Sequence, residues 1–229
     1  MKEIPYHIGI IIDGNRRWAK NKSLPFLEGH RRGLEKVKKI GRWCKKKGIK
    51  ILTLFAFSTE NWNRPKIEVS YLMKLIIQAL SQKNIKEIDE DGIRIKIIGQ
   101  KERLSSRLQE IIKKAEATTR NNREGILNIA LNYGGKAEIV EAVKKIIKKR
   151  VPFHKISEKL IEANLWTSGE PHPDLIIRTG GEERLSNFLI WQTAYSELYF
   201  SKKYWPDFTE EDLDEILEDY SHRQRRFGK

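Results

Sequence analysis

The sequence predicts an α/β fold, a single domain in which helices flank a mostly parallel six-stranded sheet. Short β-branched runs, such as 7–12 and 51–57, alternate with longer segments of helical periodicity. Strands that alternate with helices imply right-handed crossovers, which make neighbouring strands parallel. No stretch rich in Gly, Ser or Pro divides the 229 residues, so we expect one domain over 1–229.

The chain opens with a buried strand over 7–12 that stops abruptly at 13–15, Asp-Gly-Asn, a sequence typical of a turn. A basic loop follows, and 29–33 leads into a helix that ends near Gly48, a plausible C-terminal cap. Cys44 lies on the apolar face of that helix, which predicts a small core residue.

A second buried strand over 51–57 ends in a polar loop, 58–65. A long helix is expected over 66–90, and between 72 and 80 it is apolar on most of its circumference. Such a helix is buried, pairs with another subunit or lines an apolar cavity.

Strict alternation over 93–97 predicts a half-exposed strand near a sheet edge. A C-terminal helix is expected from Thr209, with Asp212 placed for a capping box, before a basic tail. The other expected elements are helices over 101–121, 136–149 and 157–164, a strand over 126–131 and a buried strand that ends at Arg178.

Three of these buried strands end in polar and basic side chains, and the carboxyl ends of parallel strands share one edge of a sheet. Guanidinium groups match phosphate oxygens, and glycines allow backbone N–H groups close to a phosphate. One acid among them suggests a metal held between the protein and an anionic ligand. The clusters are Asp13, Asn15, Arg16, Arg17 and Trp18; Ser58, Asn61, Trp62 and Arg64; and Arg178, Thr179, Arg184 and Ser186.

The net charge of +14 is compatible with a solvated lysine-rich surface, nucleic acid, anionic lipid or a polyphosphate substrate. A single cysteine excludes an intrachain disulfide framework and fits a reducing compartment. No apolar run approaches the roughly 20 residues that span a bilayer, and the first residues lack the apolar core of a signal peptide. We therefore expect a soluble, cytoplasmic protein.

The motifs resemble those of the cis-prenyltransferases of the undecaprenyl diphosphate synthase family. The resemblance runs through almost the whole chain, with its motifs in the family's order. The matching segments are 13–19 (Asp-Gly-Asn-Arg-Arg-Trp-Ala), 29–30, 53–65, 132–135 (Asn-Tyr-Gly-Gly) and 174–200.

The resemblance implies an enzyme that adds isopentenyl diphosphate units to an allylic diphosphate such as farnesyl or geranylgeranyl diphosphate, with each new double bond cis. The product would be a cis-polyprenyl diphosphate, the precursor of a lipid carrier for glycan synthesis. Mg²⁺ would be required, with Asp13 and Glu197 as its ligands. The resemblance also implies a homodimer, with 189–200 as a reasonable interface, and the basic surface suits peripheral contact with a membrane.

The resemblance also assigns site residues. Asp13 and Asn61 would be catalytic, Asn61 as the proposed proton acceptor, although an amide is a poor base and the departing diphosphate is a rival. The allylic diphosphate would be bound by Gly14, Asn15, Arg17 and His30, with Arg16 and Trp18 in the same motif. The reaction centre would be lined by Ser58, Thr59, Glu60, Trp62 and Arg64, and isopentenyl diphosphate would be bound by Arg178, Arg184, Leu185 and Ser186.

Two positions depart from the family pattern. Phe26 stands four residues before His30, where the family often has an arginine, and Arg16 stands where many bacterial members have glycine. We take Arg16 as the candidate replacement for the missing contact.

Several of these residues also have a purely structural interpretation. Asp13 could be a turn former, His30 a structural residue, Glu197 a surface acid, and Trp18 or Trp62 packing residues. Two other functions compete with the enzyme: a non-catalytic partner subunit of a heteromeric prenyltransferase, and a basic nucleic-acid-binding module. The first motif is intact and no nucleic-acid motif is present, so we expect neither, and no nucleic-acid partner. No Asp-Asp-x-x-Asp occurs, which excludes a trans-prenyltransferase.

Overall fold

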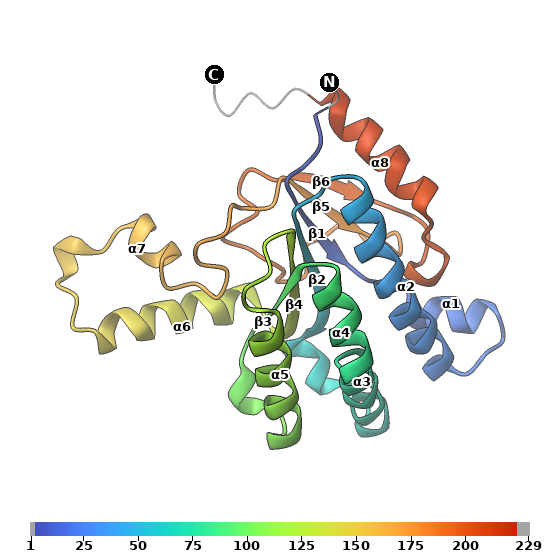
Figure 1. Cartoon of the computed structure of the whole chain (residues 1–229), viewed down its shortest axis with the longest axis horizontal. Helices are drawn as coiled ribbons and strands as arrows, with labels where there is room; N and C mark the ends of the chain where they lie inside the picture. Colours follow the sequence, from blue (N-terminus) through green and yellow to red (C-terminus); the bar gives the residue numbers. More distant parts are fainter. Residues whose placement is uncertain (1–2, 224–229) are drawn as a thin grey trace.

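The computed structural model describes residues 3–223 and confirms the α/β fold with a six-stranded sheet (Figure 1). Every pair of neighbouring strands is parallel, and the order is β3-β4-β2-β1-β5-β6. The strands are β1 (His7–Ile11), β2 (Ile51–Ser58), β3 (Ile93–Ile98), β4 (Gly125–Tyr133), β5 (Leu175–Arg178) and β6 (Glu197–Phe200).

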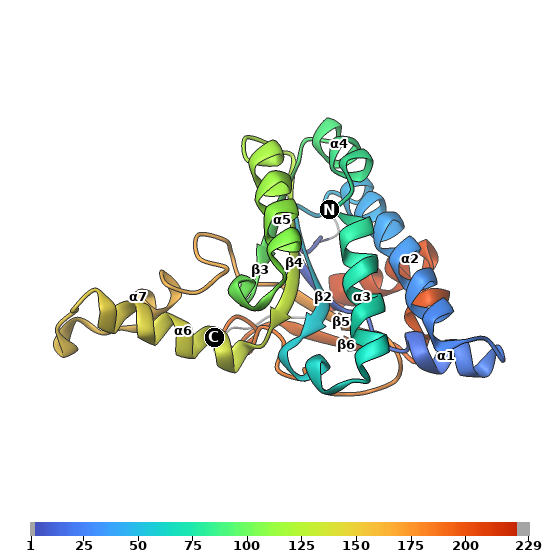
Figure 2. The same cartoon turned by 90° about the horizontal axis from the view of Figure 1, so that it is seen from below.

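Helices pack against this sheet and project from it. Figure 2 shows α2 and α3 side by side, and the two helices contact each other, whereas in both views α6 and α7 extend away from the body as an arm (Figures 1 and 2). The α-helices are α1 (Asn15–Asn21), α2 (Phe26–Lys46), α3 (Lys66–Ala79), α4 (Gln82–Glu90), α5 (Ser106–Thr119), α6 (Gly135–Lys148), α7 (Glu158–Glu162) and α8 (Glu210–His222). Short 3-10 turns are η1 (Thr59–Asn63), η2 (Lys101–Arg103), η3 (Phe153–Lys155) and η4 (Trp205–Asp207).

Apolar side chains fill the space on both faces of the sheet. Leu52 and Leu54 of β2 pack with α2 and α8, where Trp205 is completely buried as a core residue. Phe55, one residue further along, points to the opposite face and stacks on Phe188, with ring centroids 4.7 Å apart. The alternation of a strand thus places side chains of β2 in the cores on both faces of the sheet.

The expected long helix over 66–90 is wrong, because the segment forms two helices, α3 and α4. Ser81 has an extended backbone. The amide of Asn84 donates to the carbonyls of Gln78 and Ala79, at 2.9 and 3.1 Å, and so satisfies the C-terminal end of α3. An apolar pattern cannot show such a local break.

The expected start of the second helix is also wrong, since α2 begins at Phe26, directly after Pro25, rather than beyond 29–33. Gly29 and Gly33 lie inside the helix, where a Cβ atom would clash with Asn15. These glycines are required by close packing of α1 on α2 rather than by a turn.

Several local expectations are confirmed. β3 is an edge strand. Cys44 is buried, and burial raises the pKa of its thiol to about 12. Thr209 and Asp212 form a capping box at the start of α8. The helix expected over 101–121 is shorter and consists of η2 and α5.

Within residues 3–223 no helix is long and apolar enough to cross a membrane. The basic tail predicted after α8 lies, from residue 224 onward, outside the described residues.

Candidate active site

The carboxyl ends of β2, β1 and β5 lie next to one another and bring the three predicted clusters together. Ile11 of β1 is paired with Phe55 on one side and with Arg178 on the other. Asp13 therefore follows the central strand of the three, with one cluster on either side.

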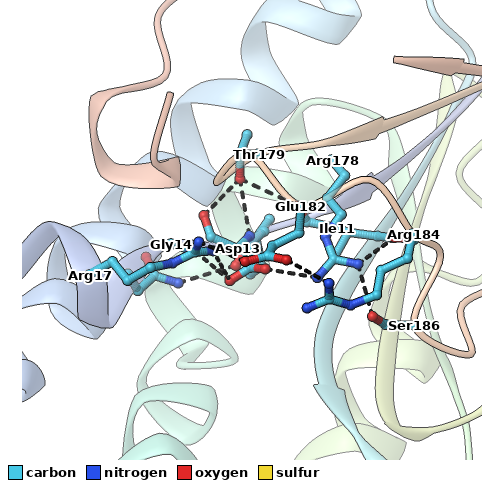
Figure 3. Close-up of polar contacts among 11 residues, drawn as sticks. Ile11, Asp13, Gly14, Arg17, Arg178, Thr179, Glu182, Arg184 and Ser186 are labelled. Carbon is cyan, nitrogen blue, oxygen red and sulfur yellow. Dashed lines mark hydrogen bonds and ion pairs between the residues drawn. The ribbon is translucent and has the colours of Figure 1, made fainter. Parts of the chain in front are cut away.

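Asp13 is bound by groups from both flanks (Figure 3). Its Oδ2 accepts a hydrogen bond from Nη2 of Arg178 at 2.9 Å, and its Oδ1 accepts from the backbone N–H of Gly14 at 2.6 Å. Nη2 of Arg17 lies 3.3 Å from Oδ1. The Thr179 hydroxyl holds the backbone of Asp13, accepting from its N–H at 3.0 Å and donating to its C=O at 2.8 Å.

These contacts keep the Asp13 carboxylate charged. Partial burial would raise the pKa of this carboxyl, but the hydrogen bonds from Arg178 and Gly14 and the charges of Arg178 and Arg17 lower it below its usual value. The side chain remains about one-third exposed (32%), so its free lone pairs are open to a ligand.

On the β5 side, a buried guanidinium organises the third cluster. Arg178 is 4% exposed and donates from Nη1 to Oγ of Ser186 at 2.8 Å and to the carbonyl of Arg184. Its Nε is buried and has no hydrogen-bond partner among residues 3–223. Ser186 has a positive φ of 48°, a strained conformation that recurs at ligand sites. This donor-rich corner suits an anion.

Glu182 is a site residue that the sequence analysis did not assign. Its Oε1 accepts from Arg17 at 3.0 Å and its Oε2 from Arg184 at 2.5 Å (Figure 3). The hydrogen bond from Arg184 and its charge lower the pKa of this carboxyl. Glu182 thus joins an arginine of the first cluster to one of the third. Its position in the sequence between Arg178 and Arg184 was the signal that could have identified it as a site residue.

On the other flank, a basic cavity of about 550 Å³ opens beside Asp13. Its walls come from α1, α2 and the end of η1, and they carry several cations within one cavity. The polar and charged lining residues are Asp13, Asn15, Arg16, Arg17, Lys20, His30 and Arg64. Arg16 also lies over the Phe26 ring, 5.7 Å from its centroid, so the two departures from the family pattern contact each other.

His30 is buried in the wall of this cavity. Burial lowers the pKa of its imidazole, and the neighbouring Glu68 carboxylate, which favours the charged form, does not reverse that shift. His30 is therefore a neutral hydrogen-bonding group at neutral pH.

A larger cavity of about 610 Å³ runs from Asp13 between the sheet and helices α2 and α3. Its far part is lined by aliphatic side chains, among them Leu34, Leu75 and Ile129. A smaller cavity of about 130 Å³ continues beyond it and shares the lining residues Ala79 and Leu80. The apolar pattern of 72–80 therefore marks a cavity wall as well as core.

The η1 turn closes the mouth of the large cavity. Oδ1 of Asn61 accepts from the backbone N–H of Ser58 at 3.2 Å, and the two residues form a capping box. Glu60 accepts from Asn187 at 2.8 Å, which ties η1 to the loop that holds Ser186. Ser58, Glu60, Asn61 and Arg64 all line the cavity, as predicted for a shared site.

Other predicted residues lie beside the cavities rather than in their walls. The Trp18 indole donates to Asp207 at 2.7 Å. Trp62 donates to Asn132 at 2.7 Å and packs on Phe57. Thr59 lies close to Gly134, and Leu185 packs against the core around Phe188. Their contacts lie next to the site, and their substrate-binding roles stay predictions.

Glu197 is not brought to Asp13 within one chain. It is the first residue of β6 and is paired with Leu175, at the start of β5, so it lies at the opposite edge of the sheet. Its carboxylate accepts from Arg223 at 2.9 Å. As a metal ligand, Glu197 stays a prediction that requires a second copy of the chain.

The residues around Asp13 fit a magnesium ion that is shared with a ligand. Among residues 3–223 no group of three or more His, Cys, Asp or Glu could hold a metal. Mg²⁺ often binds through one or two carboxylates together with substrate phosphates, which a charged, partly exposed Asp13 beside a basic cavity allows.

Asp13 thus lines both a basic cavity and a larger cavity with an aliphatic far part, which suits an α/β enzyme for substrates that join an anionic group to an apolar chain. Comparisons with known proteins agree. The family model described as "Putative undecaprenyl diphosphate synthase" matches residues 11–228. The chain belongs to this undecaprenyl diphosphate synthase family of cis-prenyltransferases.

Individual relatives cover the whole chain. A ditrans,polycis-undecaprenyl-diphosphate synthase, (2E,6E)-farnesyl-diphosphate specific, from Legionella pneumophila (strain Paris) is 48% identical over 231 residues, 99% of this chain and 97% of that protein. An isoprenyl transferase of Bacillus cereus (strain ATCC 10987 / NRS 248) is 48% identical over 98% of this chain and 88% of its own. The crystal structure of lavandulyl diphosphate synthase from Lavandula x intermedia with dimethylallyl diphosphate has a TM-score of 0.94, at 39% identity and 99% coverage of both chains.

Proposed function

We propose that this cis-prenyltransferase condenses isopentenyl diphosphate with an allylic diphosphate such as farnesyl or geranylgeranyl diphosphate. The product is a cis-polyprenyl diphosphate, a precursor of a lipid carrier for glycan synthesis. One observation carries the proposal: Asp13, Arg178 and Ser186 line the large cavity, whose far part is apolar, and a separate basic cavity opens on the other side of Asp13. The printed name of the Legionella relative, a farnesyl-diphosphate-specific synthase, supports this substrate class.

The pocket on the α1 side takes the allylic diphosphate. Arg16, His30 and Arg64 converge there, next to the mouth of the large cavity that receives the prenyl chain. Guanidinium donors stabilise the negative charge that grows on the diphosphate as its bond to the allylic carbon breaks. The carbon chain lies among aliphatic side chains, which exclude water from the cation formed at that carbon.

The corner on the β5 side takes isopentenyl diphosphate. Arg178, Arg184 and Ser186 supply its donors. The double bond of isopentenyl diphosphate attacks the allylic carbon, and a proton then leaves to restore a double bond. Because an amide is a poor base, we assign the departing diphosphate as proton acceptor and Asn61, whose Oδ1 is held by the backbone N–H of Ser58, as a donor that orients the reactants.

Magnesium is the metal that we propose for the site, with Asp13 as its protein ligand. When bound, Mg²⁺ would neutralise charge on the leaving diphosphate. The Asp13 carboxylate is fixed for that task by Arg178 and by the backbone of Gly14.

A homodimer is the assembly that we propose, as the family resemblance implies. Segment 189–200 carries exposed side chains suited to an interface, such as Ile190 and Tyr195. A second copy is also required if Glu197 is to reach a metal. We further propose a cytoplasmic enzyme that contacts the membrane surface, since its net charge of +14 favours anionic lipid.

A chain-elongation assay tests the proposal. Purified protein is incubated with Mg²⁺, farnesyl diphosphate and radiolabelled isopentenyl diphosphate, and the products are separated by length. We expect a ladder that ends at a defined length and disappears with EDTA. If no allylic diphosphate supports incorporation, the chain is a non-catalytic partner subunit, and a salt-dependent shift of DNA or RNA would favour the nucleic-acid-binding alternative.

A further inference from the structure

Glu68, in the first turn of α3, is a buried acid that none of the assigned roles explains. It is 1% exposed. Its Oε1 accepts from Nη1 of Arg64 at 2.9 Å and lies 3.2 Å from Nε2 of His30, and its Oε2 lies 3.3 Å from Nη1 of Arg16. All three partners line the basic cavity.

These partners come from three different elements. Arg16 belongs to α1, His30 to α2, and Arg64 follows η1, so the carboxylate joins all three to α3. Glu68 itself lines neither the basic cavity nor the large apolar one. It lies behind the wall and reaches the cavity only through the groups that it holds.

Burying a carboxylate is unfavourable unless it is well partnered, which three contacts achieve here. Each guanidinium offers five N–H donors, so a contact with Glu68 leaves donors of Arg16 and Arg64 free for a phosphate. A single negative charge against two guanidinium groups also leaves the wall net positive. The Glu68 carboxylate therefore fixes the cationic donors in place before the ligand binds.

We propose that Glu68 is a positioning residue that orients Arg16, His30 and Arg64 toward the diphosphate of the allylic substrate. The proposal rests on the proposed function, which places that diphosphate in the basic cavity. The proposal predicts the direction in which removal of Glu68 changes the affinity for the anion. If Glu68 were only a repelling charge, its removal would strengthen binding of the anion, whereas loss of a positioning residue weakens it.

The test compares Glu68→Gln and Glu68→Asp with the wild-type protein. Calorimetric titration with farnesyl thiodiphosphate, a slowly reacting analogue, gives the Kd for the allylic site, and steady-state kinetics give the KM for isopentenyl diphosphate. For Glu68→Gln we expect the allylic Kd to rise roughly tenfold, the lower end of the effect of losing an outer-shell partner. We expect the KM for isopentenyl diphosphate to stay within about twofold, a split that general destabilisation would not produce.

Glu28→Gln serves as matched control, since Glu28 also holds two arginines, Arg31 and Arg32, but at the surface of α2. It should leave both constants unchanged. If Glu68→Gln does not fold, Glu68→Asp keeps the charge but withdraws the carboxylate by one methylene, and it should still raise the allylic Kd. An unchanged or lower allylic Kd in the folded variant overturns the proposal. Failure of the wild-type protein to bind the analogue would instead contradict the proposed function.

Discussion

Asp13 and Arg178 form the salt bridge at the centre of the site, with Oδ2 and Nη2 2.9 Å apart. The guanidinium is buried, whereas the carboxylate is one-third exposed toward the cavities. Removing one partner of a buried ion pair commonly costs about 3–5 kcal/mol, because the other charge is left uncompensated. Asp13→Asn, which keeps a hydrogen-bond acceptor, is therefore a sharper probe of function than Asp13→Ala.

Asp13→Asn should lower kcat by roughly 10²–10³-fold, the range that loss of one preorganised electrostatic group produces. The amide can still accept from Arg178, but it lacks the charge that binds a metal. Steady-state assays with saturating substrates and Mg²⁺ measure the loss. Asp214→Asn, at an exposed carboxylate on α8, is the control and should retain full activity. Near-normal turnover of Asp13→Asn would show that Asp13 is only a turn former.

Arg16→Gly should raise the KM for the allylic diphosphate by about tenfold, since one charge-assisted contact is worth about 1.5–3 kcal/mol. The KM for isopentenyl diphosphate should not change. Adding Phe26→Arg should restore part of the loss, because the Phe26 ring lies under the Arg16 guanidinium. Arg32→Gly on the exposed side of α2 controls for the general cost of a helical glycine. Unchanged KM values for both substrates would show that Arg16 makes no substrate contact.

Ala79→Phe should shorten the longest product. Ala79 lines both the large cavity and the smaller one beyond it, so a ring there would close their junction. Products separated by chain length should shift downward while the allylic KM is retained. Ile67→Phe, at a side chain of α3 that is 70% exposed, is the control. An unaltered product ladder would mean that the growing chain leaves by another route.

Stability should fall on acidification from about pH 6.5. Burial lowers the pKa of both His7 and His30 in the folded state, and the neighbouring acids, Glu170 and Asp174 at His7 and Glu68 at His30, offset this only in part. The unfolded chain, whose histidines have pKa values near 6.5, therefore takes up protons first as the pH falls.

Urea unfolding between pH 5 and 8 measures the free energy of unfolding of wild type and of the double variant His7→Gln, His30→Gln. The double variant should show a flatter dependence on pH, whatever its absolute stability. His154→Gln, at an exposed histidine, should leave the slope unchanged. Equal slopes for wild type and the double variant would contradict the assignment.

The sequence allowed the parallel sheet and the convergence of three clusters to be predicted, because strand ends carry both signals locally. Breaks in a helix within an apolar segment were harder to predict. The Asn84 amide caps the C-terminal end of α3, although the apolar pattern of the sequence continues beyond that point. Similarly, Gly29 and Gly33 look like turn residues until the contact with Asn15 shows why a helix needs them.

The charged residues behind the site could not be predicted in the same way. Glu68 and Glu182 are ordinary acids in the sequence, and their importance appears only when distant arginines converge on them. Glu197 shows the converse. Its motif predicts a metal ligand, yet the parallel register places it at the edge away from Asp13.

The central claim is that two diphosphates bind on opposite sides of Asp13. The most direct test measures the KM of each substrate in Arg184→Gln and Arg64→Gln. Arg184→Gln should raise the KM for isopentenyl diphosphate about tenfold and spare the allylic substrate, and Arg64→Gln should do the reverse, each having lost one charged contact. Equal effects of each variant on both substrates would contradict a two-sided site.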